Sequence, residues 1–245
     1  MRETRSCSIS RRLATRLLQP PAMPQILPCV EIGPQREPAE GSVVWLHGLG
    51  ASGHDFEPIV PMLRQPGLRF VFPHAPSQPV TINGGFVMPA WYDILTLDRS
   101  PDRESEADIR RSATLVEALI EREKQRGVPA ERIVLAGFSQ GAAMAMHVGL
   151  RYLETLAGLL ILSGYRVLPQ HFEAERSEAN QRTPMLVCHG TLDPMLPIDL
   201  GHEARDFLRE QMPQAEIEWH EFPIQHEVSV PEIEVVAAWL AKRFG

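Results

Sequence analysis

A serine between glycines stands where an apolar run gives way to a helical pattern. Ser139 is the central residue of GFSQG, which continues the run RIVLAG and leads into QGAAMAMHVGLRYL. In a strand–turn–helix context, G-x-S-x-G is typical of a nucleophile elbow, where small flanking residues let a strained serine project above a sheet. The Gln140 amide would then lie at a helix N-terminus, which stabilises an oxyanion. The pattern predicts a nucleophile at Ser139, and the alternative is a chance turn in which Ser139 caps the helix.

A serine hydroxyl needs a base that takes its proton and an acid that orients the base. In hydrolases built around this elbow, the chain order is serine, then aspartate or glutamate, then histidine. Asp193 follows the apolar run MLVCHG within TLDP, and His226 follows IEWHEF within PIQHE. Both would reach the sheet edge that carries Ser139, because parallel strands end at one edge. The sequence therefore predicts a catalytic triad of Ser139, Asp193 and His226.

Other residues are weaker candidates for these roles. Ser163 lacks the flanking glycine pair, Cys188 lies in an apolar run typical of a core, and Asp199 is placed to begin or cap a helix. His47 and His189 each precede a glycine at a strand end and are expected to fix loop backbone by hydrogen bonding. The other histidines precede the triad position or lie within expected elements: His54, His74, His147, His171, His202 and His220.

The stretch GLGASG, residues 48–53, has the G-x-G-x-x-G spacing of a dinucleotide-binding loop. Such a loop needs an acidic residue about 20 positions on, at the end of the next strand. The next apolar run, LRFVFPHAP, ends in proline and histidine, which argues against a nucleotide-dependent oxidoreductase. The same glycines suit an oxyanion hole, because they let the backbone approach a substrate closely. Leu49 and Gln140 are therefore the expected oxyanion donors.

Short apolar runs alternate with amphipathic stretches from about residue 26 onward. The runs ILPCVEI, VVWLHG, LRFVFPH, RIVLAG, LAGLLILSG, MLVCHG and IEWHEF predict strands. Helices are predicted over 55–64, 104–126, 140–153, 198–211 and 230–244. This alternation is typical of the α/β class, with a mostly parallel central sheet and helices on both faces.

Residues 73–103 form a segment too long for a simple connection and rich in proline, glycine and aromatic residues. Long segments of this kind within a compact domain are commonly functional. Phe86, Met88 and Trp91 are therefore candidate substrate-binding residues that would form a wall for an acyl chain. Packing of the segment on the body of the protein is an equally good interpretation.

Composition limits the classes of partner for this chain of 245 residues. A net charge of −7 argues against nucleic acid or an anionic membrane. Three cysteines give no disulfide framework, which favours a reducing, cytoplasmic compartment. Neither a metal nor another cofactor is called for, and no apolar stretch reaches the roughly 18 residues of a membrane span. The expected partner is a small-molecule or lipid ester, for a monomer or a homodimer.

The first 22 residues differ from the rest of the chain because they carry five arginines and one acid. We expect residues 1–22 to be a disordered N-terminal extension, with an organelle-targeting leader as the alternative. Residues 23–245 are expected to form a single domain.

Together, these motifs resemble the phospholipase/carboxylesterase family of small serine hydrolases, which includes acyl-protein thioesterases. The resemblance runs from about Leu27 to the C-terminus and is carried by HGLGASG, FPHAP, PVTINGG, AWYDI, GFSQGAAM, CHGTLDP and the final HE. It implies an α/β-hydrolase fold without a large cap domain, with the triad and the oxyanion donors named above. Three places differ from the expected pattern without removing a catalytic group: Ala142 and Gln225 replace common glycines, and Arg166-Val167 lengthens a loop.

The sequence thus predicts a serine hydrolase that cleaves carboxylic esters of short to medium acyl chains through an acyl-enzyme. An acyl-protein thioesterase or a lysophospholipase with the same triad is the alternative. A non-catalytic binding protein on a hydrolase scaffold is less favoured, because no member of the triad is missing.

Overall fold

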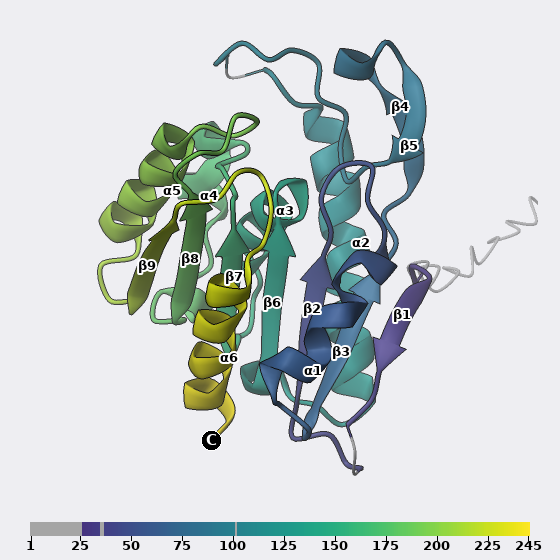
Figure 1. Ribbon diagram of the computed structural model, residues 1–245, viewed down its shortest axis with the longest axis vertical. Coiled ribbons are helices and arrows are strands. Elements are labelled where there is room, and N and C mark those ends of the chain that lie inside the picture. The colour runs from purple at the N-terminus through teal and green to yellow at the C-terminus, as the bar shows by residue number, and fades with distance from the viewer. Residues whose placement is uncertain (1–25, 35–36, 101) are drawn as a thin grey trace, which may run out of the picture.

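A seven-stranded sheet forms the centre of the computed structural model, which describes residues 26–34, 37–100 and 102–245 (Figure 1). The strand order is β1-β3-β2-β6-β7-β8-β9, and every neighbouring pair is parallel except β1 and β3. The strands are β1 Cys29–Ile32, β2 Gly41–Leu46, β3 Leu68–Pro73, β6 Ile133–Phe138, β7 Gly158–Leu162, β8 Met185–Gly190 and β9 Ile217–Phe222. The predicted α/β fold with a mostly parallel sheet is confirmed.

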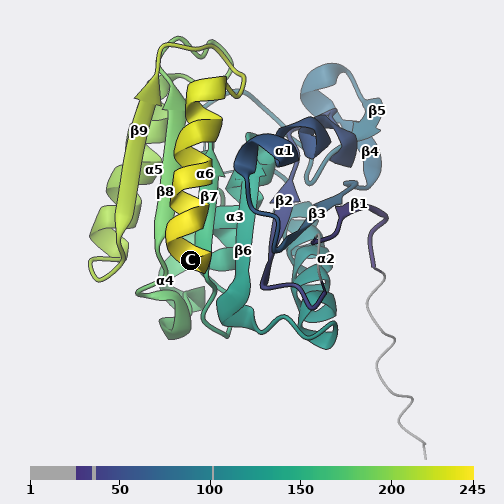
Figure 2. The same cartoon turned by 60° about the horizontal axis from the view of Figure 1, so that its bottom comes forward.

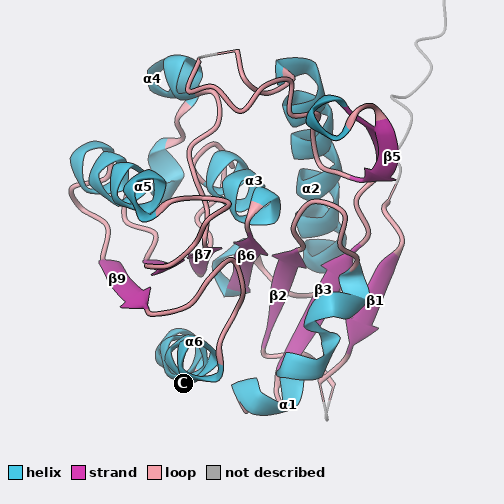
Figure 3. Ribbon diagram, turned by 45° about the horizontal axis from the view of Figure 1, so that its top comes forward, coloured by secondary structure: helices cyan, strands magenta, loops and turns pink. Residues whose placement is uncertain are grey.

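Helices cover the sheet on both faces, as Figure 3 shows. One face carries α2, α3 and α5, and the other carries α1 and α6, which lies in front of β7 and β8 in Figure 2. The α-helices are α1 Val60–Leu63, α2 Glu106–Gln125, α3 Gln140–Gly149, α4 Phe172–Glu175, α5 Ile198–Gln211 and α6 Val230–Phe244. The short 3₁₀ helices are Gly53–Ile59, Thr81–Asn83, Ala130–Arg132, Pro169–His171 and Glu178–Asn180.

Strand β2 shows why the apolar runs are continuous rather than alternating. Val44 and Leu46 pack into the core beneath α2 and α3, whereas Val43 and Trp45 pack into the core beneath α1 and α6. A strand covered on both faces must be apolar at every position. Burial of each such side chain contributes about 1.5–3 kcal/mol, so the sheet is anchored from both sides.

The segment after β2 differs from its prediction. Residues 55–64, expected as one helix, form the 3₁₀ helix Gly53–Ile59 followed by the short helix α1. Pro58 lies inside the 3₁₀ helix. Because proline has no N–H to donate and its ring crowds the preceding turn, a regular α-helix is disfavoured there.

The long segment 73–103 contains a hairpin that the sequence analysis did not predict. Strands β4 (Ser77–Val80) and β5 (Phe86–Pro89) pair antiparallel as a separate two-stranded sheet. The hairpin projects beyond the carboxyl ends of the central strands (Figure 1). It therefore lies at the sheet edge where the candidate site was predicted.

Two further observations concern the N-terminus of the chain and the character of its helices. The N-terminal extension expected over residues 1–22 lies outside the described residues. Within the part of the chain that the structure describes, no helix has the length and apolar character needed to cross a membrane.

Glu123, a fully buried carboxylate on α2, ties that helix to the sheet. Its Oε2 accepts hydrogen bonds from Ser42 Oγ at 2.7 Å and Arg69 Nη1 at 2.9 Å, and its Oε1 accepts one from Arg126 Nη1 at 3.0 Å. The Arg69 side chain is itself only 5% exposed. Removing the carboxylate charge would leave a buried guanidinium without its buried partner.

We therefore expect Glu123→Gln to lower the free energy of unfolding by about 3–5 kcal/mol, measured by urea denaturation. Glu106→Gln is the matched control, because it removes a solvent-exposed pair with Arg110 on the same helix. The control should leave the unfolding midpoint nearly unchanged. Equal losses in the two variants would show that burial of the pair is irrelevant to stability.

Candidate active site

Ser139 occupies a tight turn between β6 and α3, with φ 56° and ψ −121°. A residue with a side chain adopts this left-handed region only when its surroundings enforce it. The turn closes tightly, since a Cβ atom on Gly137 would lie 2.3 Å from the backbone carbonyl group of Gly141. A Cβ atom on Gly141 would lie 2.2 Å from the carbonyl oxygen of Leu46. Both glycines of G-x-S-x-G are thus required sterically by the elbow.

His226 and Asp193 reach Ser139 from the loops that follow β9 and β8. His226 Nε2 lies 2.8 Å from Ser139 Oγ, and His226 Nδ1 lies 2.6 Å from Asp193 Oδ2. The other carboxylate oxygen, Oδ1, accepts hydrogen bonds from the N–H groups of Met195 and Leu196, both at 2.8 Å. When Nδ1–H donates to this fixed, fully buried carboxylate, Nε2 is free to accept the serine proton. The structure therefore brings together the three residues singled out in the sequence.

Leu49 and Gln140, whose amides are the predicted oxyanion donors, line the same cavity as Ser139. Gln140 is the first residue of α3, so its N–H has no partner within the helix. Within the described chain, neither Gln140 N–H nor Leu49 N–H donates to a backbone acceptor. Gly48 brings the Leu49 segment close, because a Cβ atom on it would lie 3.3 Å from Ser139 Cβ. In the described structure, both N–H groups thus lack a backbone partner and belong to segments next to Ser139.

The side chains of Gln140 and Trp91 connect the two oxyanion segments. Gln140 Oε1 accepts a hydrogen bond from Trp91 N at 2.7 Å, and Gln140 Nε2 donates to Tyr92 O at 2.8 Å. Trp91 Nε1 in turn donates to His47 O at 2.8 Å, directly before Gly48. Trp91 is fully buried. It holds the backbone of the site from behind and does not form the acyl-chain wall that the sequence analysis considered.

His47 secures the same loop through both ring nitrogens. Nδ1 donates to Gly48 O at 2.7 Å, and Nε2 accepts from Ala75 N–H at 3.0 Å. Burial lowers the pKa of His47, which favours the neutral ring that this bonding pattern needs. The prediction that His47 fixes loop backbone is confirmed, and so is that for His189, whose Nε2 donates to Leu196 O at 2.8 Å.

Trp91→Phe keeps the aromatic bulk but removes the indole donor, leaving His47 O unpaired. We expect kcat to fall about tenfold with little change in KM, because the oxyanion segment is held less firmly in the transition state. Steady-state kinetics measures both parameters. Trp239→Phe is the matched control, since this buried indole has no hydrogen-bond partner in the described structure and lies in the opposite core. An equal loss in the control would refute the connecting role of Trp91.

A cavity of about 610 Å³ opens over Ser139. Much of its apolar lining comes from segment 82–97, through Ile82, Met88, Ile94 and Leu97. Other apolar lining residues come from elsewhere in the chain: Leu49, Phe56, Ile59, Phe138, Met195, Leu196 and Val228. Of the three residues considered for the acyl-chain wall, Met88 lines this cavity. Phe86 lies on the hairpin with 68% of its surface exposed and does not line it. Phe138, beside Ser139 in the motif, was missed, although its position next to the nucleophile could have indicated it.

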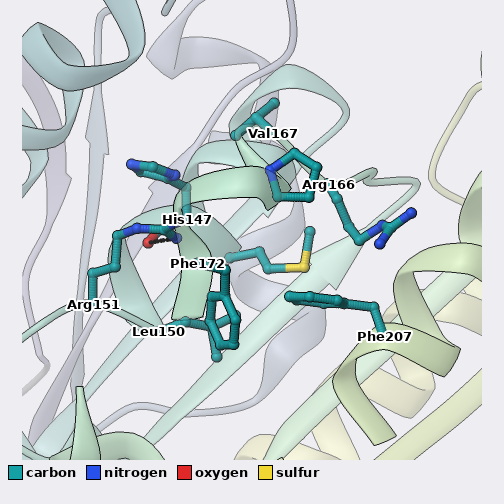
Figure 4. Close-up of a pocket in the computed structure, with 9 residues that line it drawn as sticks. His147, Leu150, Arg151, Arg166, Val167, Phe172 and Phe207 are labelled. Carbon is teal, nitrogen blue, oxygen red and sulfur yellow. Dashed lines mark hydrogen bonds between the residues drawn. The ribbon is translucent and has the colours of Figure 1, made fainter. Parts of the chain in front are cut away.

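A much smaller void, about 10 Å³, lies at the far end of α3 from Ser139 (Figure 4). His147, Phe172 and Phe207 line it, and Arg151 Nη1 donates to the His147 carbonyl oxygen at 3.2 Å. It has room for about one water molecule and is too small for a substrate. Burial, with a smaller contribution from the Arg151 charge, lowers the pKa of His147 from its ordinary 6.5 to about 3.

This buried histidine predicts a specific loss of stability in acid. Between pH 6.5 and about 3 the unfolded chain binds a proton that the folded chain does not, so stability falls as the pH falls through this range. The loss from His147 alone is about 2 kcal/mol at pH 5. His147→Gln should therefore narrow the difference between the unfolding free energies at pH 7 and pH 5. Equal differences in the variant and the parent protein would contradict this assignment.

No group of three or more His, Cys, Asp or Glu side chains suited to a metal occurs in residues 26–34, 37–100 and 102–245. The site's functional groups are a hydroxyl, an imidazole, a carboxylate and two amides. Residues 27–244 match the model of the phospholipase/carboxylesterase family. The chain belongs to this family. The match confirms the resemblance inferred from the motifs. Phospholipase/carboxylesterase proteins are hydrolases.

Individual members of the phospholipase/carboxylesterase family are similar over most of the chain. Acyl-protein thioesterase 1 of Yarrowia lipolytica is 35% identical over 218 residues, covering 87% of this chain and 96% of that protein. The Neurospora crassa protein of the same name is 36% identical over 213 residues, covering 82% and 86%. The crystal structure of Arabidopsis thaliana SOBER1 superposes with a TM-score of 0.77 at 31% identity, covering 84% of this chain and 99% of that one. Zea mays acyl-protein thioesterase 2 gives 0.77 at 25% identity, covering 89% and 99%.

Proposed function

We propose that this protein is a serine hydrolase that cleaves acyl thioesters, and carboxylic esters by the same route, through an acyl-enzyme on Ser139. The observation that carries the proposal is the continuous hydrogen-bond chain from Ser139 Oγ through His226 to Asp193, at 2.8 and 2.6 Å. Relatives at 35% and 36% identity are named acyl-protein thioesterases. Their names favour the thioester over the simple ester that the sequence analysis put first.

In the proposed reaction, His226 Nε2 takes the proton of Ser139 Oγ as the oxygen attacks the acyl carbonyl carbon. The carbonyl oxygen becomes negative and accepts hydrogen bonds from the N–H groups of Leu49 and Gln140, each worth about 2.7–4 kcal/mol in the transition state. The Asp193 carboxylate stabilises the imidazolium. His226 then protonates the departing thiolate or alkoxide and activates the water that releases the acid.

A carboxylesterase for short to medium acyl chains is the second candidate. The cavity's apolar lining takes an acyl chain regardless of whether sulfur or oxygen leaves. A crystal structure named esterase PE8 is 27% identical with a TM-score of 0.75, covering 89% of this chain and 99% of that one. Both candidates use the same acyl-enzyme and differ in the leaving group.

The two candidates are separated by two peptides that differ only at the acylated residue, which is S-octanoyl cysteine in one and O-octanoyl serine in the other. We expect a higher kcat/KM for the thioester than for the ester when each kcat/KM is divided by the rate constant for hydroxide-catalysed hydrolysis of the same substrate. A normalised preference for the oxygen ester would establish the carboxylesterase instead. Failure to cleave either peptide, or any simple octanoyl ester, would refute the hydrolase proposal.

A further inference from the structure

A guanidinium lies beside the apolar part of the cavity formed by segment 82–97. Arg103 lines this cavity together with Ile94 and Leu97. It also lines an adjoining groove of about 280 Å³, and Tyr165 is shared by both spaces. The Arg103 side chain is thus a charged group at the boundary between the substrate cavity and a second, more polar space.

Packing fixes the position of this guanidinium. Its central carbon lies 4.7 Å from the centre of the Tyr165 ring, and its Nε is in ion contact with Glu104 Oε1 at 2.6 Å. The Tyr165 hydroxyl is bonded in turn to the Tyr92 hydroxyl at 2.7 Å, deep in the core. The Arg103 side chain is 14% exposed and that of Glu104 is 4% exposed. A group held this firmly loses little conformational freedom when it binds a ligand.

The outer nitrogens of Arg103 are not used in this packing. Among the described residues, neither Nη1 nor Nη2 donates a hydrogen bond to a protein acceptor, and the contact with Glu104 is made through Nε. Guanidinium N–H groups match the two oxygens of a carboxylate in a paired arrangement. Within the part of the chain that the structure describes, Arg103 therefore presents an oriented donor pair without a partner beside an apolar wall.

The charged residues that line the adjoining groove leave a positive excess there. The adjoining groove is lined by Arg99, Arg103 and Arg166 against Glu104 and Glu203. Burial raises the pKa of Glu104 to about 7, which weakens the countercharge nearest to Arg103 around neutrality. The acidic residues of the main cavity, Asp55 and Glu227, come from other segments of the chain. An anion is therefore the ligand that best complements this boundary.

We propose that Arg103 binds a carboxylate at the far end of the acyl chain, so that the preferred acyl groups are those of dicarboxylic acids carrying one ester or thioester. This inference rests on the proposed acyl transfer at Ser139. The methylenes would lie along Ile94 and Leu97, and the distal carboxylate would meet the outer nitrogens of Arg103. Arg103 is thus a specificity-determining residue, and it takes no part in the bond-making steps.

The test compares substrates of equal chain length with and without the distal charge. Monoethyl adipate, suberate and sebacate are paired with ethyl hexanoate, octanoate and decanoate, respectively. The same pairs can be made as S-ethyl thioesters. We expect the ratio of kcat/KM values, charged over neutral, to reach about ten at the best length, mainly through KM. In Arg103→Met the ratio should fall to one or below, and in Arg103→Lys part of the preference should remain.

Two further variants guard against a simple loss of folding. Glu104→Gln removes the countercharge and should raise the ratio. Arg103→Met/Glu104→Gln leaves no uncompensated charge and should remove the preference even if the single variant Arg103→Met is unstable. Arg99→Met is the matched control in the groove and should keep most of the preference, because that guanidinium is already paired with Glu203 at 2.9 Å.

The outcomes separate this inference from the proposed function. If the neutral esters are hydrolysed and the charged esters are not preferred, the role of Arg103 is overturned but the hydrolase proposal stands. The same holds if the preference for the charged esters survives in the double variant. Inactivity towards both series would refute the hydrolase itself. Octanoyl esters of 4-hydroxybutanoate place the carboxylate on the alcohol instead. An Arg103-dependent preference confined to those esters would assign the anion to the leaving group and overturn its assignment to the acyl chain.

Discussion

Ser139→Ala is expected to lower kcat on the order of 10⁶-fold while KM changes little, because the variant loses the nucleophile but keeps the cavity. The His226 ring would remain held by Asp193, so the rest of the site should persist. Initial rates with an octanoyl thioester measure the loss. Covalent labelling by a fluorophosphonate gives a second readout, since the label requires an activated serine and should be absent from the variant.

Ser163→Ala provides a matched control for that experiment. Ser163 also follows a central strand, adopts a positive φ of 47° and is buried, so it resembles Ser139 in local geometry. Its Oγ has no hydrogen-bond partner in the described structure and therefore no base. Labelling should survive in Ser163→Ala. Labelling that survived in Ser139→Ala and disappeared in Ser163→Ala would identify Ser163, directly after β7, as the nucleophile.

Asp193→Asn is expected to reduce kcat by about 10⁴-fold with the fold intact. The amide oxygen would stay on the N–H groups of Met195 and Leu196, so the amide NH₂ would face His226 Nδ1. That arrangement favours the tautomer with its proton on Nε2, which cannot accept the serine proton. Steady-state kinetics together with thermal unfolding distinguishes this effect from misfolding.

Asp199→Asn is the comparison for Asp193→Asn. Asp199 is exposed in the first turn of α5, as the sequence suggested for this rival acid. Its replacement should leave kcat within about twofold, since the exposed side chain does not line the cavity over Ser139. A large loss of kcat in Asp199→Asn, with Asp193→Asn nearly as active as the parent protein, would make Asp199 the acid of the triad in place of Asp193.

The positions of the candidate triad could be predicted because they depend on chain order and strand ends. Buried strands β6, β8 and β9 are evident as apolar runs, and parallel strands place the residues that follow them at one edge. The elbow glycines carry a local steric requirement, which a short motif can report. The catalytic role of Ser139, Asp193 and His226 remains a prediction of this geometry.

The contacts behind the site could not be predicted, because they join residues far apart in the chain. Nothing near Trp91 in the sequence shows that its indole meets His47 O, 44 positions earlier. An aromatic residue in a long segment rich in proline and glycine is compatible with either a ligand wall or a core. Arg103 and Tyr165 likewise come together only through tertiary packing.

The hairpin β4–β5 was missed for a local reason. Its strands are four residues long and contain Pro79 and Pro89, and its turn contains Gly84 and Gly85, both at positive φ. Proline and glycine are typical of loops, so the short alternation between them gives little signal. Antiparallel pairing of β1 was also not anticipated, because an edge strand can join in either direction without changing its apolar pattern.

The separate pairing of β4 with β5 has a consequence for how this protein could diversify. Because the hairpin shares no ladder with the central sheet, insertions or exchanges within residues 77–89 would leave the seven-stranded framework unbroken. The elbow has no such latitude, since even one added methyl group at Gly137 or Gly141 collides with the main chain. Changes in this hairpin can therefore alter the lining of the cavity in related proteins, while the turn that carries Ser139 stays the same.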